Sequence, residues 1–397
     1  MPIQSVENLL TFLQRMRVLT PDEAQEVEHE LGPHFADPVD LAHCLAENNW
    51  LTEYQIPLLF TERWEELAIG PDVVLDRLGE GGVSEVLKAW DTVRGRPVAL
   101  KVLRQHLSDR DSALREFQRE LQTVTRLAHP NIIKIYEADQ IGALHYFAME
   151  YVEGLDLDRY VRQSGPLSIE QACNCARQVA QGLQHAHQLG LVHRDIKPAN
   201  LFWINAPTSS GAAARRGGSD AMVKILDWGL ARLRPDAGAS GGPSALDMDT
   251  EKGMLIGTVD YIAPEQARDP CLVDIRADIY SLGCTLYFLL TGQPPFRGNS
   301  LMQKLLQHQD AERPQVRDLR PDVPEELATV VQRMMAKRPE DRDQIPLLVV
   351  APLRRYVNGS GLVRLISAAN GAARPGSLPP AKPLTSINLS MRLPDDP

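Results

Sequence analysis

The chain has 397 residues, of which 43% are hydrophobic and 24% are charged, so it is long enough for two or three domains and wholesale disorder is excluded. Its 42 basic and 52 acidic side chains give a formal charge of −10, which argues against non-specific binding to nucleic acid or anionic lipid, since both need a basic surface. Residues 1–70 hold 13 acidic and three basic side chains, whereas the remainder is balanced. The first segment therefore differs in composition from the rest.

Residues 5–66 are expected to form about four short helices in an acidic all-α domain at 1–68. Thr20–Glu23 and Thr52–Gln55 each predict a helix start with a capping box, and Asp37-Pro38 predicts a third start. No catalytic motif lies in this segment. Two readings stay open, a solvated appendage and a docking module for a partner.

From Asp72 the pattern changes to β-strands. The predicted strands are 73–75, 86–90, 97–103, 132–137 and 145–151, with a helix at 112–127. After Leu155 the pattern is mainly helical, and Ser168–Gln171 predicts a capping box at the start of a long helix. Residues 206–220, 235–252 and the tail are too poor in large apolar side chains to offset the entropy of ordering them.

The cysteines and the N-terminal sequence indicate the cellular compartment in which the protein is expected. Five cysteines are few and odd in number, so no disulfide framework is implied and a reducing, cytoplasmic location is expected. Cys173 and Cys175 lack a second pair at zinc-finger spacing, which favours small apolar helix residues over metal ligands. No signal peptide and no apolar stretch long enough to cross a bilayer is evident, so we expect a soluble protein.

A glycine-rich turn, Gly79-Glu80-Gly81-Gly82-Val83-Ser84, lies between two predicted strands. Such a turn lets backbone amides approach phosphate oxygens, although most glycine turns are only hairpins. A strand follows it rather than a helix, which disfavours a dinucleotide-binding turn. Lys101, in an apolar strand, requires a phosphate or a carboxylate as partner, and Glu120 on the helix that follows is the obvious carboxylate. An exposed edge-strand lysine is the alternative.

Three further strings follow in order: Val192-His193-Arg194-Asp195-Ile196-Lys197-Pro198-Ala199-Asn200, then Ile225-Leu226-Asp227-Trp228-Gly229, then Gly257-Thr258-Val259-Asp260-Tyr261-Ile262-Ala263-Pro264-Glu265. With these motifs the sequence resembles the eukaryotic-type (Hanks-type) serine/threonine protein kinases over residues 72–356. The run Ala277–Gly283 is similar to bacterial members in style.

The resemblance implies an α+β, bilobal protein-kinase fold with a small β-rich N-lobe and a mainly helical C-lobe, preceded by the small all-α domain. The implied boundaries are an N-lobe at 72–149 and a C-lobe at 150–356. The C-lobe would contain a flexible insert at 206–220 and an activation segment at 227–265, and residues 357–397 would form a disordered tail.

The resemblance also implies the catalytic roles. Asp195 would accept the proton of the substrate hydroxyl, with Lys197 near the transferred phosphoryl group. Lys101 would bind the α- and β-phosphates while paired with Glu120. ATP is the implied cofactor, with Mg²⁺, or Mn²⁺ as an alternative, held by Asn200 and Asp227. Phosphoryl transfer depends mainly on positioning and on cations that offset the developing charge, which is why these residue types suit it.

The nucleotide site follows from the same resemblance. Its residues would be Gly79, Gly81 and Ser84 over the phosphates, Val86, Ala99 and Phe202 around the adenine, Met149 behind it, the backbone of Glu150 and Val152 at its edge, and Asp156 near the ribose. Outside this site, Asp278 would brace the catalytic loop and Glu265 would pair with Arg342.

Several residues near these motifs indicate the kinase class, suggest how activity is regulated, or depart from the usual motifs. Lys197-Pro198 and Thr258 resemble serine/threonine rather than tyrosine kinases, and Arg194 suggests control through phosphorylation of the activation segment, at Thr250 first and at Ser244 or Thr258 otherwise. Ser84 stands where the third glycine is usual. Trp228 replaces the usual aromatic residue after the metal-binding aspartate, and its indole N–H requires a partner.

Three function classes are compatible with these motifs. The first is an active protein kinase acting on protein substrates. The second is a pseudokinase-like scaffold that binds nucleotide and recruits partners, which is disfavoured because Lys101, Asp195 and Asp227 are all present. The third is a kinase-fold enzyme acting on small molecules, which would generally lack the Ala263-Pro264-Glu265 segment.

Overall fold

The computed structural model describes residues 3–61, 63–81, 84–103, 124–142, 144–204, 221–228, 259–269 and 273–357. The described residues form two compact units. One draws on the described parts of 1–105 and 136–151, and the other on those of 106–135 and 152–372. No helix in the described part of the chain is long and apolar enough to span a membrane.

The first unit begins with a helical segment, residues 5–67. It comprises α1 (Val6–Arg15), α2 (Pro21–Glu30), η1 (Gly32–His34), α3 (Pro38–Glu47), α4 (Gln55–Leu59) and η2 (Trp64–Leu67). The predicted starts of α2 and α3 are confirmed: Thr20 and Glu23 form a reciprocal capping box, and Asp37 accepts from the Val39 N–H at 2.8 Å. Short helices are marginal alone, and here their apolar faces share one buried cluster that includes Leu9, Leu13 and Leu41.

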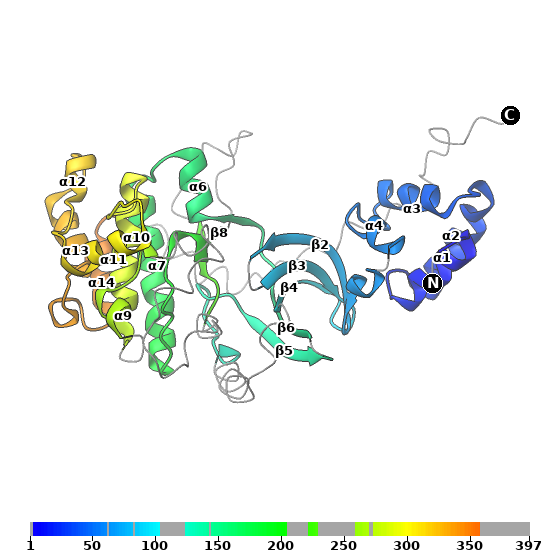
Figure 1. Cartoon of the computed structure of the whole chain (residues 1–397), viewed down its shortest axis with the longest axis horizontal. Helices are drawn as coiled ribbons and strands as arrows, with labels where there is room; N and C mark the ends of the chain where they lie inside the picture. Colours follow the sequence, from blue (N-terminus) through cyan, green and yellow to red (C-terminus); the bar gives the residue numbers. More distant parts are fainter. Residues whose placement is uncertain are drawn as a thin grey trace. The chain divides into compact units, whose positions relative to one another are not determined.

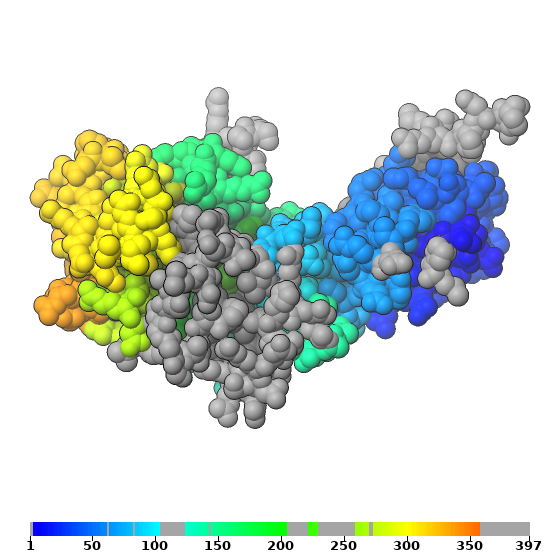
Figure 2. All heavy atoms as spheres, viewed as in Figure 1, coloured from blue at the N-terminus to red at the C-terminus, as the bar shows by residue number. Residues whose placement is uncertain are grey.

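A six-stranded sheet follows in the same unit, in the order β1-β2-β3-β4-β6-β5 (Figure 1). The pairs from β1 through β4 to β6 are antiparallel. The strands are β1 (Ala68–Ile69), β2 (Asp72–Glu80), β3 (Ser84–Asp91), β4 (Arg96–Leu103), β5 (Ile135–Ile141) and β6 (Leu144–Glu150). Figure 2 shows the atoms of the helical segment running into those of the first strands without a break on this face.

The strands of the structure differ in places from the predicted ones, and β2 runs from Asp72 to Glu80 where only 73–75 was predicted. The strand predicted at 132–137 begins only at Ile135, and Ile132 instead makes an isolated parallel bridge to Ile225. Ile132 and Ile133 are buried in the second unit, so their apolar character reflects helix and strand packing there rather than membership of the sheet. The two-residue strand β1 was not predicted, because it is too short to show a period.

The second unit is mainly helical. Its strands are β7 (Gly154–Asp156), β8 (Leu201–Ile204) and β9 (Met222–Ile225), in that sheet order. Its helices are α6 (Leu157–Ser164), α7 (Ile169–Gln188), η4 (Pro198–Asn200), α9 (Pro264–Arg268), α10 (Ile275–Thr291), α11 (Leu301–Asp310), α12 (Val316–Leu319), α13 (Glu325–Met334), η8 (Pro339–Asp341) and α14 (Leu347–Arg354).

Helices α7 and α10 form the centre of this unit. The predicted capping box at Ser168 and Gln171 starts α7, which packs against α10 and α14 (Figure 1). Helix α10 is buried along nearly its whole length, including the charged Asp278. A carboxylate at such a position requires hydrogen-bond donors, and the residues that supply them lie in the candidate site.

Candidate active site

Three polar side chains meet at the loop that contains Asp195. Lys197 Nζ lies 2.9 Å from Asp195 Oδ2, and Asn200 Nδ2 donates to the same oxygen at 3.1 Å and to the Asp195 carbonyl at 2.8 Å. Asn200 is positioned by the 3₁₀ turn η4, whose first residue, Pro198, has the backbone angle that such a turn needs. Both donors contact Oδ2, and within the described residues no donor to Oδ1 of Asp195 is found.

The backbone of this loop is fixed by Asp278 of α10. The N–H groups of His193 and Arg194 donate to its two carboxylate oxygens at 2.8 and 2.7 Å. Burial raises the pKa of Asp278, while His193 and these hydrogen bonds act in the opposite direction. Arg194 has a positive φ of 68°, an uncommon conformation for a residue with a side chain, and the paired N–H bonds hold it there. The predicted brace between Asp278 and the loop is therefore confirmed.

Asp227 lies two residues after the end of β9, and the intervening Leu226 connects it to the same loop. The Leu226 N–H donates to the Asn200 carbonyl at 2.9 Å, and the His193 ring contacts the Leu226 carbonyl through Nε2 at 2.7 Å. The Asp195 N–H donates to His193 Nδ1, so Nε2 carries the ring proton. Asp227 itself has a positive φ of 61°, a strained conformation of the kind that occurs at functional sites.

Trp228 packs beside this strained residue. Its ring lies edge-on to His193 with the ring centroids 4.7 Å apart, and its side chain is buried. Within the described residues its indole Nε1–H has no acceptor. The expectation that Trp228 packs as a large apolar group is confirmed, whereas its expected hydrogen-bond partner is not found among the described residues.

Asn200 and Asp227 suit a hard divalent cation. The amide nitrogen of Asn200 donates to Asp195, so its oxygen is the atom left for a cation, and Asp227 adds a carboxylate. Within the part of the chain that the structure describes, no group of three or more His, Cys, Asp or Glu side chains could hold a metal. Two protein ligands, completed by phosphate oxygens and water, fit a magnesium-like ion better than zinc.

The first unit contains the predicted phosphate-binding turn. The Gly81 N–H donates to the Ser84 carbonyl at 2.8 Å and closes the hairpin between β2 and β3. A Cβ at Gly79 would meet no described atom within 4 Å, and its φ is not in the left-handed region. The described part of the chain therefore sets no steric requirement for glycine at this position, which is compatible with the expected approach of phosphate oxygens to the backbone.

The neighbouring strands bring the other predicted residues of this unit into register. Val86 of β3 lies opposite Lys101 of β4, and Ala99 lies opposite Met149 of β6. Glu150 pairs with Val98 at the end of β6. Lys101 is only 8% exposed, so the alternative of a solvent-exposed edge lysine is wrong.

The remaining nucleotide-site residues lie in the second unit. Asp156 of β7 pairs in register with Phe202 of β8, and Val152 precedes β7. Asp156 also caps α6, because its Oδ1 accepts from the Arg159 N–H at 2.8 Å. One of its carboxylate oxygens is thus engaged by the protein.

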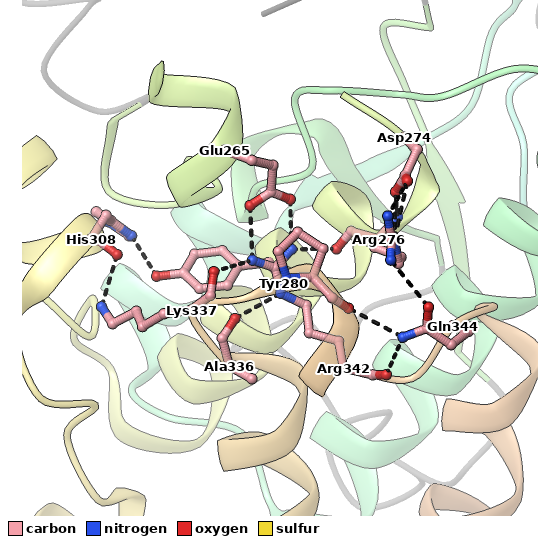
Figure 3. A network of polar contacts seen from close by, with 10 residues as sticks. Glu265, Asp274, Arg276, Tyr280, His308, Ala336, Lys337, Arg342 and Gln344 are labelled. Atoms are coloured by element: carbon pink, nitrogen blue, oxygen red, sulfur yellow. Dashed lines mark hydrogen bonds and ion pairs between the residues drawn. The ribbon is translucent and has the colours of Figure 1, made fainter. Parts of the chain in front are cut away.

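Glu265 and Arg342 form the ion pair that the sequence predicted (Figure 3). The pair is bidentate at 2.6 and 2.8 Å, and Arg342 also donates to the carbonyls of Arg276, Ala336 and Lys337. Its guanidinium lies over the Tyr280 ring, 4.8 Å from the centroid. A buried arginine is stable only with such a full set of acceptors, and this one joins α9, α10 and η8.

Two residues near these motifs were missed. Gln266 donates from Nε2 to the Arg194 carbonyl at 2.7 Å, and Lys304 of α11 pairs with Asp260 at 2.5 Å in a largely buried contact. Both partners are remote in sequence, so no local spacing could reveal them. Glu120, Ser244, Thr250 and Thr258 lie outside the described residues, as do the segments 206–220 and 235–252.

Comparison with known proteins identifies the family. A model of the protein kinase domain matches residues 73–352, and the chain belongs to this family. Serine/threonine-protein kinase PknB of Mycobacterium tuberculosis (strain ATCC 25618 / H37Rv) is 38% identical over 288 residues, which cover 71% of this chain and 42% of PknB. Serine/threonine-protein kinase PrkC of Bacillus subtilis (strain 168) is 35% identical over 271 residues, 68% of this chain and 38% of PrkC.

Solved structures agree with this assignment. The crystal structure of the Mycobacterium tuberculosis PknI kinase domain matches with a TM-score of 0.54 at 26% identity, covering 73% of this chain and 98% of that domain. The resemblance to bacterial kinases and the predicted kinase fold after N-terminal helices are confirmed. Members of this family use ATP and a divalent cation. The match covers less than half the length of each of the two curated relatives, PknB and PrkC.

Proposed function

We propose that this chain is a serine/threonine protein kinase that transfers the γ-phosphoryl group of ATP to Ser or Thr hydroxyls of proteins. The observation that carries the proposal is the hydrogen-bonded group of Asp195, Lys197 and Asn200. It contains an acceptor for a hydroxyl proton, a cation for the transferred group and an oxygen ligand for a metal. A scaffold that only binds nucleotide has no use for this complete set.

The roles divide among the chain's own residues. Asp195 would accept the hydroxyl proton through Oδ1, while Lys197 offsets the charge that develops on the phosphoryl oxygens. Asn200 and Asp227 would hold the cation, which when bound neutralises phosphate charge and orients the leaving group. We assign this cation to Mg²⁺, with Mn²⁺ as a substitute. Lys101 would bind the α- and β-phosphates under the glycine-rich turn, with Glu120 as its carboxylate partner.

The nucleotide and its surroundings follow the same assignment. The purine would lie among Val86, Ala99 and Phe202 with its edge on the Glu150 and Val152 backbone, the ribose near Asp156, and the phosphates under Gly79, Gly81 and Ser84. We infer autophosphorylation of the activation segment, with Thr250 as the first site, supported by Arg194 in the loop beside Asp195. A cytoplasmic site of action is supported by the four described cysteines, all of which are free.

For the helical segment we propose a second role, the docking of a partner protein. Its support is the excess of acidic over basic side chains in residues 1–70. We assign residues 1–68, which include this segment, to a helical domain and residues 72–356 to the kinase domain.

Transfer of labelled phosphate from γ-labelled ATP tests the kinase proposal. Purified wild type, Asp195→Asn and Asp227→Asn would be compared with a generic basic protein as acceptor, in Mg²⁺, in Mn²⁺ and in EDTA. Loss of a positioned general base or of a metal ligand reduces such transfer by about 10²–10⁴-fold. Asp322→Asn, an exposed aspartate of the second unit, is the matched control and should retain full activity. Undiminished transfer by Asp195→Asn would overturn the assignment.

Mapping of the labelled residues tests the regulatory part. Phosphate at Thr250 supports the first choice, and phosphate only at Ser244 or Thr258 replaces it. A wild type that binds ATP but never transfers phosphate, to itself or to the acceptor, would favour the scaffold.

A further inference from the structure

The helical segment contacts the sheet through Thr52, which lies just before α4, and Gln55, the first residue of α4. Thr52 and Gln55 form the reciprocal capping box that the sequence predicted: the Thr52 N–H donates to Gln55 Oε1 at 2.9 Å, and the Gln55 N–H donates to Thr52 Oγ1 at 3.3 Å. Both side chains have a further donor, and both donors are directed to β2. Thr52 Oγ1 donates to the Leu75 carbonyl at 2.6 Å and Gln55 Nε2 to the Val74 carbonyl at 2.7 Å.

These two carbonyls lie at an irregularity of the sheet. Val74 pairs with Ala89 and Asp76 with Lys88, so Leu75 is an extra residue in β2 and a bulge forms there. A bulge removes a carbonyl from the strand ladder, and a buried carbonyl without a donor destabilises the folded state. Val74 and Gln55 are almost completely buried. The capping pair therefore supplies, from outside the sheet, the donors that the bulge requires.

The bulge separates two halves of β2 that differ in burial. Residues 72–75 are buried, whereas residues 76–80, which lead into the glycine-rich turn, are exposed. The exposed half is held by its pairing with β3 and by an ion pair between Arg77 and Glu80 at 2.9 Å. Bulges bend a strand and increase its twist, so the bulge at Leu75 contributes to the direction of this exposed ribbon, together with a second register shift between Arg77 and Gly79.

Two more contacts support the same junction. Tyr54, between the two capping residues, packs against both the helical cluster and the cluster of the sheet. Burial raises its pKa, and the nearby Glu85 at the base of the glycine-rich turn adds to the effect. The segment also continues directly into β1, whose residues pair with the start of β2. The helical segment is thus joined to β2 at the start of the strand and at the bulge.

We propose that Thr52 and Gln55 are positioning residues for ATP: by holding the bulge at Leu75 they help to set the direction of the strand ribbon that ends in the glycine-rich turn. This inference rests on the proposed kinase function, because it assigns that turn to the phosphates. It gives the helical segment a role inside the kinase unit that needs no partner protein. Nucleotide affinity then depends on residues remote from the nucleotide.

The test uses the full-length chain with Thr52→Val and Gln55→Leu, which keep the approximate volume but remove the donors. The KM for ATP is expected to rise about threefold to tenfold in each, the equivalent of one lost hydrogen bond, with a smaller change in kcat. Thr52→Ser retains the hydroxyl and should restore the wild-type KM. Thr20→Val is the matched control, because it removes a capping bond in the same segment without contacting β2. It should lower the melting temperature and leave the KM for ATP unchanged.

Titration with ADP separates the two proposals, because binding needs no turnover. If the wild type binds ADP but transfers no phosphate, the kinase proposal fails while the ADP dissociation constants of the variants still test the positioning role. Equal constants for wild type, Thr52→Val and Gln55→Leu, all folded by circular dichroism, would overturn the inference. An equal loss of affinity in Thr20→Val would overturn it too, since general destabilisation would then explain the effect.

Discussion

Asp72, at the start of β2, is an aspartate whose surroundings oppose its charge. Its side chain is 1% exposed, its Oδ2 has no hydrogen-bond partner among the described residues, and Asp91 lies directly opposite on β3. Burial, and then the charges of Asp91 and Glu137, raise the pKa of Asp72 to about 7, although Arg94 and Arg96 act against this. The Asp72 carboxyl group has a pKa near 3.9 in the unfolded chain. Between about pH 4 and pH 7 it is therefore protonated in the folded chain and ionised in the unfolded chain.

Stability is expected to fall as the pH rises from about 4 to 7, because the folded state binds more protons than the unfolded state in this window. Asp72→Asn removes the charge, so the variant should be more stable than wild type at pH 8 by about 1–3 kcal/mol and nearly equal to it at pH 4. Urea unfolding at both pH values measures this. Asp76→Asn, exposed on the same strand, should show little change at either. A variant less stable than wild type at pH 8 would show that Asp72 is needed as an anion.

A substitution at Gly79 tests whether glycine is needed there for ATP binding or for folding. Since a methyl group would meet no described atom there, Gly79→Ala should leave the melting temperature nearly unchanged while the KM for ATP rises about tenfold. Gly95→Ala provides the contrast, because Gly95 has a φ of +63° that alanine rarely adopts. It should lower stability by about 1 kcal/mol without changing the KM for ATP. Equal behaviour of the two variants would contradict the role given to the turn.

At the scale of elements, the contact of α10 with α13 depends on the absence of a side chain at Gly283. A Cβ there would lie 2.8 Å from the Met334 Cβ and 3.3 Å from its carbonyl carbon, so the α13 backbone would have to move. Gly283→Ala gains about 1 kcal/mol in helix propensity but should still destabilise the protein by about 1–3 kcal/mol, through overpacking.

Chemical denaturation measures the effect at Gly283. Gly298→Ala is the comparison, because its methyl would meet only the flexible side chains of Gln303 and Lys304, and it should change stability by less than about 0.5 kcal/mol. A Gly283→Ala variant that is more stable than wild type would mean that α13 can shift without loss.

Structural features that depend on residues close together in the sequence could be predicted from it. The side-chain bonds of Thr20, Asp37, Thr52 and Ser168 to the backbone span two or three residues, so the local pattern predicted them. Three of them start a helix as predicted, whereas α4 begins only at Gln55, after Thr52. Asp195, Lys197 and Asn200 lie within one motif, and their mutual bonds agree with it.

Features formed by remote partners were not predictable in this way. The bulge at Leu75 and the bonds from Thr52 and Gln55 to β2 join residues about twenty positions apart, and Lys304 pairs with Asp260 across two separate elements. Neither the hydrophobic periodicity nor the composition around either residue of such a pair predicts that the two are in contact. The predicted separation of a domain at 1–68 followed from charge and helical spacing, which carry no information on how that segment meets the sheet.

At the scale of the whole molecule, the helical segment and the sheet are expected to unfold as one body. A segment of about 60 residues is marginal alone, because so little of its surface is buried. Here its core cluster shares Tyr54 with the cluster of the sheet, and its capping pair satisfies two carbonyls of β2. Separation would expose Tyr54 and leave both carbonyls without donors. Local opening of the helices alone should therefore be unfavourable.

Hydrogen exchange at increasing urea, followed by mass spectrometry on the full-length chain, measures this coupling. Peptides from α1, α3 and β3 should lose protection together, at one urea concentration and with one free energy of opening. In Gln55→Leu the helical peptides should open at lower urea than those of β3, because one of the joining bonds is gone. If the wild-type helices open well before β3, the segment is an independent domain, and the coupling between Thr52, Gln55 and the glycine-rich turn loses its physical basis.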